Sequence, residues 1–192
     1  MNVQKAIFPA FLVGALLVVG LIRLVLRPNL QVQAANWTKA NAVQTIPDAN
    51  AGNGDCSLAA AYPPEVNRWC NWIEENANQY GLDPNFVAAL ILQESGGDPQ
   101  AYSRSGAVGL MQVMPRDGIA AGFECINGPC FGARPSMAEL FDPQFNIQFG
   151  VKMLAGLVAK KGDLREALRA YGPLDVGYSY ADLVLSIYQN YR

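Results

Sequence analysis

The segment from Asp83 to Gly97 carries the signals for both ends of a helix. Asp83 is a favourable N-cap residue, and Pro84 is a favourable first helical residue. The two glycines at positions 96 and 97 favour termination. Between these ends, apolar residues recur at i, i+3 and i+4 spacing, at Phe86, Val87, Leu90 and Ile91. The sequence therefore predicts a helix over residues 84–95 with one buried face.

Glu94 lies on that same face, since it follows Leu90 by four residues and Ile91 by three. A carboxyl group held against apolar neighbours loses hydration, which raises its pKa and keeps it protonated near neutrality. A general acid requires this state. The alternative is a glutamate that turns into solvent at the helix end, which is the commoner arrangement for an arbitrary glutamate. The residues alone leave both readings open.

Four other helices are predicted from apolar stripes and end signals. One follows the prolines at 63–64 and ends at Gly81, and another starts at the pair 142–143 and ends at Gly162. Capping boxes at 163–166 and 179–182 would start the last two. The stripes comprise Val66, Trp69, Cys70, Ile73, Ala77 and Tyr80; Ile147, Val151, Leu154 and Val158; Leu164, Ala167, Leu168 and Tyr171; and Tyr180, Val184, Ile187, Tyr188 and Tyr191.

The stretch between the second and third of these five helices is long, rich in glycine and irregular, with one short helix expected near residues 108–113. Loops of this length inside a compact domain are usually functional. Residues 116–136 are expected to be loop with a few short turns. No run alternates convincingly between apolar and polar residues, so strands should be absent or minor. The predicted fold class is mainly α.

Residues 6–22 form an uncharged apolar run that continues past Arg23 to Arg27. The run is just long enough to span a membrane if Arg23 reaches the interface. A cleaved signal peptide is the alternative, with a small-residue site at 32–34, although that site lies far beyond the run. We expect an uncleaved transmembrane anchor over 1–27, a flexible linker over 28–55 and a folded domain over 56–192.

Four cysteines, Cys56, Cys70, Cys125 and Cys130, follow the apolar run. Cys125 and Cys130 flank a turn-forming sequence that could bring their sulfurs together, and Cys56 would then pair with Cys70. A zinc site is the alternative, but the spacings are not typical of zinc and no histidine completes one. Two disulfides indicate an oxidising compartment. This outweighs Arg23 and Arg27, which by the positive-inside rule would place the domain in the cytoplasm.

Histidine is absent from all 192 residues. This excludes Ser-His-Asp and Cys-His catalysis and metal sites that need imidazole. Neither a metal nor a cofactor is expected. Of 14 basic residues, Lys5, Arg23 and Arg27 belong to the N-terminal segment, which leaves 11 against 16 acidic residues, a net charge of −5. An acidic domain without a basic stripe is a poor nucleic-acid binder. A carbohydrate or another neutral ligand fits better.

Two motifs resemble those of the lytic transglycosylase (SLT-type) domain of the goose-type lysozyme-like superfamily. They are Glu94-Ser95-Gly96-Gly97 and the stretch 105–115, which contains Gly-Leu-Met-Gln at 109–112. The resemblance covers roughly residues 62–192. It implies a lysozyme-like fold and cleavage of the β-1,4 bond between N-acetylmuramic acid and N-acetylglucosamine in peptidoglycan. It also implies a 1,6-anhydromuramic acid product, with one glutamate acting as acid and then as base.

The resemblance also implies roles for individual residues. Glu94 would be the catalytic acid, and the substrate-binding residues would be Ser95, Gly109, Met111, Gln112, Tyr171 and Tyr180. Met114 is expected in the core. The third family motif is incomplete, because Gly172 stands where an asparagine is expected. The possible second carboxylates, Asp98, Asp117 and Asp142, read better as turn or cap residues.

Two rival functions remain at this point. One is a lysozyme-like muramidase, in which water replaces the substrate O6 hydroxyl, and the other is a non-catalytic peptidoglycan-binding or scaffold module. The expected partners are peptidoglycan glycan strands, the membrane through the N-terminal helix and a larger envelope-spanning assembly. The expected location is membrane-anchored and extracytoplasmic, or secreted if the N-terminal segment is cleaved.

Overall fold

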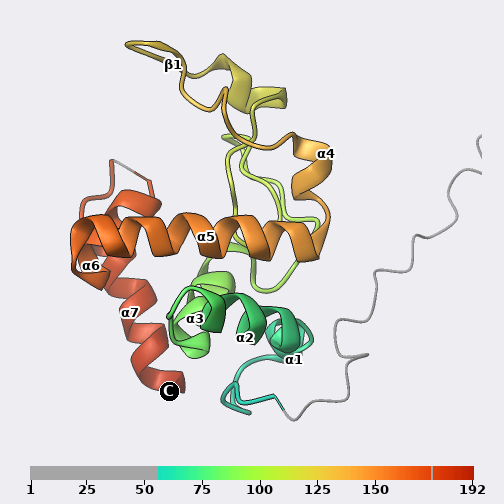
Figure 1. The fold of residues 1–192 in the computed structure, drawn as a ribbon, viewed down its shortest axis with the longest axis vertical. Coiled ribbons are helices and arrows are strands. Elements are labelled where there is room, and N and C mark those ends of the chain that lie inside the picture. The colour runs from blue at the N-terminus through green and yellow to red at the C-terminus, as the bar shows by residue number, and fades with distance from the viewer. Residues whose placement is uncertain (1–55, 174) are drawn as a thin grey trace, which may run out of the picture. The chain divides into compact units, whose positions relative to one another are not determined.

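A computed structural model describes residues 56–173 and 175–192, which belong to one compact unit, Pro47–Arg192. These residues are mainly α, as predicted (Figure 1). The helices are α1 (Pro64–Asn67), α2 (Cys70–Gln79), α3 (Pro84–Ser95), α4 (Met137–Leu140), α5 (Pro143–Lys161), α6 (Leu164–Tyr171) and α7 (Ser179–Tyr191), with a 3-10 turn at Gly118–Gly122. The strands β1 (Glu124–Cys125) and β2 (Gly128–Pro129) form a small antiparallel hairpin.

The predicted anchor over 1–27 and linker over 28–55 lie outside the described residues. Within the part that the structure describes, no helix is both long enough and apolar enough to cross a membrane.

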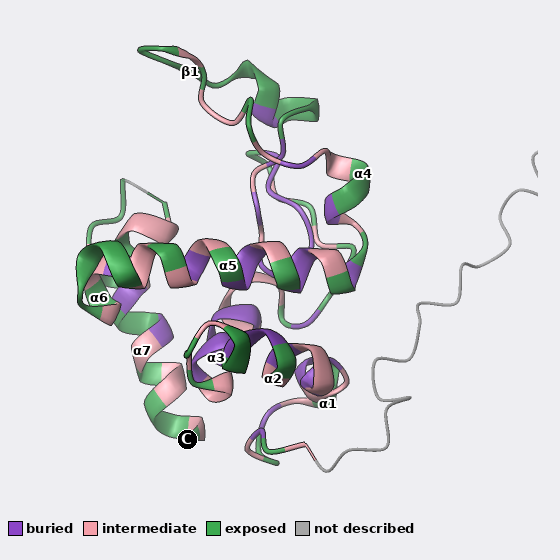
Figure 2. Cartoon of the chain, in the orientation of Figure 1, coloured by how far each residue is buried: buried purple, intermediate pink, exposed green. Residues whose placement is uncertain are grey.

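Helix α3 packs against α2 on one side and α7 on the other, and its middle, residues 86–91, is buried (Figures 1 and 2). Its ends are those predicted: the Asp83 carboxylate accepts a hydrogen bond from the Asn85 N–H, and Gly96 ends the helix in the left-handed conformation. The predicted apolar face, Phe86, Val87, Leu90 and Ile91, is at most 1% exposed. This burial fixes the position of the final turn, which carries Glu94.

The helix predicted after the proline pair is in fact two helices. The break falls at Arg68 and Trp69, where the N–H of Trp69 bonds to the carbonyl of Val66 in a tighter turn. The chain bends there so that the Trp69 indole N–H can donate to the carbonyl of Gly97 at 2.9 Å. The bend therefore joins the first helices to the end of α3, a contact between distant segments that local periodicity does not contain.

The short helix expected near residues 108–113 is absent. Val108 instead pairs with Val113 and with Tyr102 in isolated antiparallel bridges. Gly109 has φ of 74° and Gln112 has φ of 45°, and both values are incompatible with a right-handed helix. The segment is therefore a tight loop, called here the 108–113 loop.

The C-terminal helices begin and end close to the predicted residues, but only some caps are as expected. Asp142 and Asp163 each accept a backbone N–H at the start of α5 and α6. Helix α7 has no side-chain cap: Ser179 donates to the carbonyl of Val176, and Asp182 pairs instead with Arg165 on α6. Packing between α6 and α7 has thus replaced the predicted capping box.

The hairpin β1–β2 projects from the helices and is largely exposed (Figures 1 and 2). A disulfide joins Cys125 to Cys130 across it, and a second joins Cys56 to Cys70 at the start of α2. Both agree with the pairing expected from sequence. Only the second disulfide involves a core residue, since Cys70 is 2% exposed.

Candidate active site

Glu94 lies in the last turn of α3, with its carboxyl group partly buried. Burial raises the pKa of Glu94 from its ordinary 4.5 to about 7, and a hydrogen bond from the Tyr180 hydroxyl acts in the opposite direction. Among the described residues, no other acidic side chain contributes to this rise. Near neutrality the group is therefore divided between its protonated and ionised forms.

Tyr180 comes from the first turn of α7 and donates its hydroxyl to Oε1 of Glu94. Burial and the neighbouring Glu94 carboxylate both raise the pKa of Tyr180, so the phenol keeps its proton and remains a donor. Tyr171, at the end of α6, also interacts electrostatically with Glu94, and burial raises its pKa as well. Two helices thus each supply a neutral phenol to the surroundings of the acid.

Ser95 faces the 108–113 loop. Its hydroxyl donates to the carbonyl of Leu110 at 2.8 Å and accepts the N–H of Gly97 at 3.1 Å. These partners of the hydroxyl are backbone groups. In this structure Ser95 therefore holds the loop against the end of α3, which positions the loop relative to the acid.

Asn146 on α5 organises the 108–113 loop and is fully buried. Its side-chain oxygen accepts the N–H of Met111 at 2.8 Å, and its amide nitrogen donates to the carbonyls of Val108 and Leu140 at 2.9 and 2.8 Å. Sequence reasoning missed this residue. The signal in the sequence was that Asn146 directly precedes Ile147, a residue of the predicted buried stripe. A polar side chain that is buried at such a place needs hydrogen-bond partners.

Gly109 leaves room for the side-chain amide of Asn146. A Cβ atom at this position would lie 2.7 Å from the carbonyl oxygen of Leu140 and would overlap the Asn146 side chain. The positive φ of Gly109 also favours glycine. In this structure Gly109 lets the loop pack closely on Asn146 and Leu140, and its expected role in substrate binding stays a prediction.

Met111 supports the loop from behind. Its side chain is fully buried against α5, where a Cβ at Gly150 would lie 2.8 Å from the Met111 Cβ. The substrate-binding role expected for Met111 stays a prediction, and its side chain lies away from solvent. Its carbonyl oxygen accepts the Tyr171 hydroxyl at 2.7 Å, so Tyr171 joins the loop to α6.

The Gln112 amide donates to the carbonyls of Ala101 and Gly109 at 3.2 and 3.0 Å. Both of these bonds go to backbone carbonyls close to the loop. Met114, expected in the core, is only partly buried. The direct hydrogen bonds in this region thus join Tyr180 to Glu94, Tyr171 to the carbonyl of Met111, and Ser95 to the carbonyl of Leu110.

The three possible second carboxylates are exposed and bonded to nearby backbone. Asp98 accepts the N–H of Gln100, Asp117 that of Met137, and Asp142 that of Phe145, each at 2.7 to 2.8 Å. Asp98 and Asp142 have the turn and cap roles expected from sequence, whereas Asp117 bonds to a backbone group 20 residues away at the start of α4. The geometry therefore gives each of them a structural partner and leaves Glu94 without a paired acid among the described residues.

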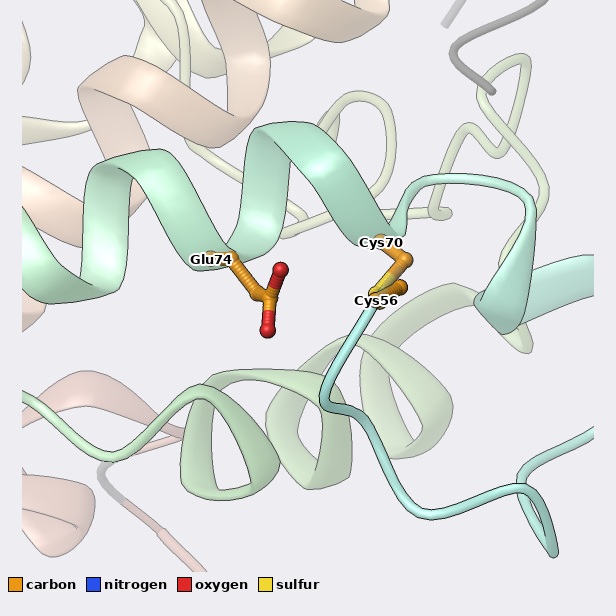
Figure 3. Close-up of side chains that lie close together, drawn as sticks. All are labelled: Cys56, Cys70 and Glu74. Atoms are coloured by element: carbon orange, nitrogen blue, oxygen red, sulfur yellow. A yellow bond between two sulfur atoms is a disulfide. The ribbon is translucent and has the colours of Figure 1, made fainter. Parts of the chain in front are cut away.

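Cys56, Cys70 and Glu74 lie close together and could suggest a metal site (Figure 3). The two sulfurs are joined in a disulfide, whereas a metal binds the thiolate form of cysteine. Glu74 accepts the N–H of Ser57 at 2.7 Å. The cluster therefore fastens the start of the domain to α2.

These observations define a helical domain with one partly buried acid held between a loop and two phenols. Residues 71–175 match the model of the family described as Transglycosylase SLT domain. The match covers more than half of the chain, which therefore belongs to this family.

Several curated proteins are similar to parts of this chain. Membrane-bound lytic murein transglycosylase E of Buchnera aphidicola subsp. Acyrthosiphon pisum is 36% identical over 95 residues, 50% of this chain and 42% of that protein. Membrane-bound lytic murein transglycosylase C of Shigella sonnei is 31% identical over 127 residues, 65% of this chain and 34% of that protein. The chain thus spans less than half the length of either relative.

A solved structure of lytic transglycosylase Slt from Pseudomonas aeruginosa, an inactive mutant, aligns with a TM-score of 0.48 and 24% identity. The alignment covers 62% of this chain and 23% of that chain.

Proposed function

We propose that this chain cleaves the β-1,4 bond between N-acetylmuramic acid and N-acetylglucosamine in peptidoglycan and leaves a 1,6-anhydromuramic acid end. The observation that carries the proposal is Glu94, a partly buried acid with a pKa of about 7 in a transglycosylase SLT domain. The relatives named lytic murein transglycosylases support the same reaction.

In the proposed reaction, protonated Glu94 donates its proton to the glycosidic oxygen, and the bond from C1 to that oxygen breaks. The acetamido group of the substrate stabilises the cationic centre at C1. The Glu94 carboxylate then accepts the proton of the O6 hydroxyl while O6 bonds to C1. Glu94 ends protonated and no water is consumed, so one carboxyl group suffices. A pKa near the ambient pH suits both steps.

Tyr180 stabilises the ionised Glu94 between the two proton transfers. While Glu94 is ionised, the Tyr180 hydroxyl donates a charge-assisted hydrogen bond to it. The bond stabilises the carboxylate and fixes its orientation. Proton return from O6 then occurs from a defined position.

We further propose that residues 1–27 anchor the chain in a membrane and residues 28–55 tether the domain over 56–192 on the extracytoplasmic side. The two disulfides and the name "membrane-bound" carried by relatives support this location. A tethered enzyme cuts glycan strands close to the membrane. Such local cutting would serve passage of a larger envelope-spanning assembly.

A muramidase that uses water in place of O6 is the competing enzyme. Gly172 is the argument for a muramidase, because the loss of the asparagine contact could leave space for a water molecule. The ring of Tyr180 lies in that space, as a Cβ at position 172 would be 2.5 Å from its Cε1 atom. A non-catalytic binding or scaffold module is the alternative of another class, and it has no use for an acid with a raised pKa.

The first test is Glu94→Gln, which should abolish release of soluble muropeptides from purified sacculi while the circular dichroism spectrum is unchanged. General acid–base catalysis contributes about 10²–10⁴-fold, so the loss is easily measured. Asp98→Asn is the matched control, because asparagine can still accept the Gln100 N–H and activity should persist. Release at the wild-type rate by Glu94→Gln would refute the assignment of the acid.

The second test identifies the sugar end of the product. The O6 hydroxyl is tethered to the reacting ring, so its effective concentration can exceed that of a loosely held water. Digestion in water enriched in heavy oxygen should give products that carry no label and are lighter by one water molecule than hydrolytic products. Products labelled at a reducing anomeric carbon would establish a muramidase instead.

A further inference from the structure

Gly172 has no conformational reason to be glycine. Its φ of −76° and ψ of −172° are ordinary extended values that any residue adopts. The reason for glycine lies instead in the space beside it. A Cβ atom at this position would lie 2.5 Å from Cε1 and 2.7 Å from Cγ of the Tyr180 ring. Real Cβ atoms do not approach other heavy atoms so closely, so either the ring or the backbone would have to shift.

We propose that Gly172 is a positioning residue for Glu94: because it has no side chain, the Tyr180 ring lies against the end of α6 and directs its hydroxyl to the Glu94 carboxyl group. The resemblance to the family implies an asparagine at position 172, whose side chain would occupy the volume of this ring. This chain thus combines a small residue at position 172 with a phenol that reaches the acid. The consequence for catalysis rests on the proposed function of Glu94.

The turn that leads into α7 is fixed close to Tyr180, so the backbone that carries the ring cannot easily move aside. Tyr178, two residues earlier, donates its hydroxyl to Glu166 on α6. The guanidinium groups of Arg165 and Arg169 lie over its ring, 4.1 and 4.7 Å from the centroid. Tyr178 thereby attaches the start of α7 to α6 from the outside.

The end of α6 is fixed as well. The N–H of Gly172 bonds to the carbonyl of Leu168 at 2.9 Å, and the adjacent Tyr171 hydroxyl bonds to the carbonyl of Met111. The Tyr180 ring therefore lies between two anchored segments. An added methyl group at position 172 would displace the ring, and with it the hydroxyl that reaches Glu94.

Displacement of the hydroxyl should change the ionisation of Glu94 in a known direction. The hydrogen bond from Tyr180 favours the carboxylate, so its loss raises the pKa of Glu94 above about 7. A hydrogen bond to a charged group corresponds to a change of about one to two pH units in that pKa. The other groups involved are Tyr171, which interacts with Glu94, and Arg134, which interacts with Tyr171.

The experiment measures the pKa of Glu94 directly, by carbon-13 NMR titration of side-chain carboxyl groups, with the Glu94 signal assigned by its absence in Glu94→Gln. Gly172→Ala and Tyr180→Phe should each raise this pKa by about one to two pH units. The double variant should show no further rise beyond Tyr180→Phe, because the hydroxyl is already gone. Gly156→Ala on α5, where a Cβ meets nothing within 4 Å, is the matched control and should leave the pKa unchanged.

The alkaline limb of the pH profile for kcat/KM should move to higher pH by the same amount in both single variants. An unchanged pKa in Gly172→Ala, together with a raised pKa in Tyr180→Phe, would overturn the role of Gly172 and leave the proposed function intact. If the NMR pKa rises but the activity profile does not follow it, the role of Gly172 stands and Glu94 is not the acid. A Gly172→Ala protein that does not fold still leaves Tyr180→Phe as a test, and an unchanged pKa there overturns the inference.

Discussion

Burial and hydrogen bonding act on the Glu94 carboxyl group in opposite directions. Loss of hydration disfavours the ionised form, whereas the Tyr180 hydroxyl favours it, and burial is the larger effect. Exposed acids such as Asp98 accept local backbone N–H groups and keep their contact with water. The chemistry proposed for Glu94 thus follows from the partial burial of its carboxyl group in the last turn of α3.

Glu94→Gln should stabilise the folded domain, and the gain should increase with pH. Because folding raises the pKa from 4.5 to about 7, the folded state holds a proton that the unfolded state releases between these values. Stability of the wild type therefore falls as the pH rises through this range, and glutamine avoids the loss. At pH values above the folded-state pKa the gain has a ceiling on the order of 3 kcal/mol. Urea denaturation of both proteins at several pH values measures this gain in stability.

The control for this measurement is Asp98→Asn, which makes the same chemical change at an exposed side chain. The effect of Asp98→Asn on the free energy of unfolding should not increase with pH. A gain for Glu94→Gln that is equal at mildly acidic and mildly alkaline pH would contradict the raised pKa.

At the scale of elements, α5 is the scaffold for the 108–113 loop. Asn146 bonds to the loop backbone, and Gly150, one helical turn later, leaves room for the Met111 side chain. Both residues face the loop because positions four apart lie on one side of a helix. The loop is thereby held in one conformation before any ligand binds.

Two glycines on α5 allow a matched test of this packing. Gly156 faces open space, so Gly156→Ala should stabilise the protein by up to about 1 kcal/mol through helix propensity. At Gly150 a Cβ would lie 2.5 Å from the Met111 sulfur, so Gly150→Ala should destabilise by about 1–3 kcal/mol. Chemical denaturation compares the two variants, and equal stabilisation by both would show that the loop does not pack on this face.

The helices could be predicted from the sequence because their signals are local. Asp83 and Asp142 cap helices within three residues of themselves, and Gly96 and Gly162 end them. The 108–113 loop could not be predicted, because its partner Asn146 lies 35 and 38 residues from the groups that it bonds. The pairing of Glu94 with Tyr180 spans 86 residues, so the sequence indicated both residues but not their contact.

At the scale of the whole domain, its first and last segments meet at the start of α3. Tyr62 stacks on Tyr191 of α7 with ring centroids 4.4 Å apart, and its hydroxyl donates to the carbonyl of Asn85. Tyr188 donates to Asp83 at 2.7 Å. Helix α3 is therefore enclosed by parts of the chain from both ends of the domain.

Loss of the Cys56–Cys70 disulfide should weaken this enclosure more than loss of the hairpin disulfide. Cys56→Ser should lower the free energy of unfolding by about 2–4 kcal/mol. Cys125→Ser together with Cys130→Ser should have a much smaller effect, because the hairpin is largely exposed. Denaturation of the oxidised protein measures both effects, after mass spectrometry has shown the two linked peptides in the wild type. Four alkylatable thiols in the native protein would contradict the disulfides and the proposed location.

Both disulfides join cysteines that follow one another in the order of the chain. A chain that is exported from its N-terminus presents Cys56 and Cys70 to the oxidant before the later two cysteines emerge. The first pair can then form while no wrong partner is present, and the second pair has only itself left to join. Maturation of the domain should therefore need an oxidant but no isomerase to correct mispaired thiols.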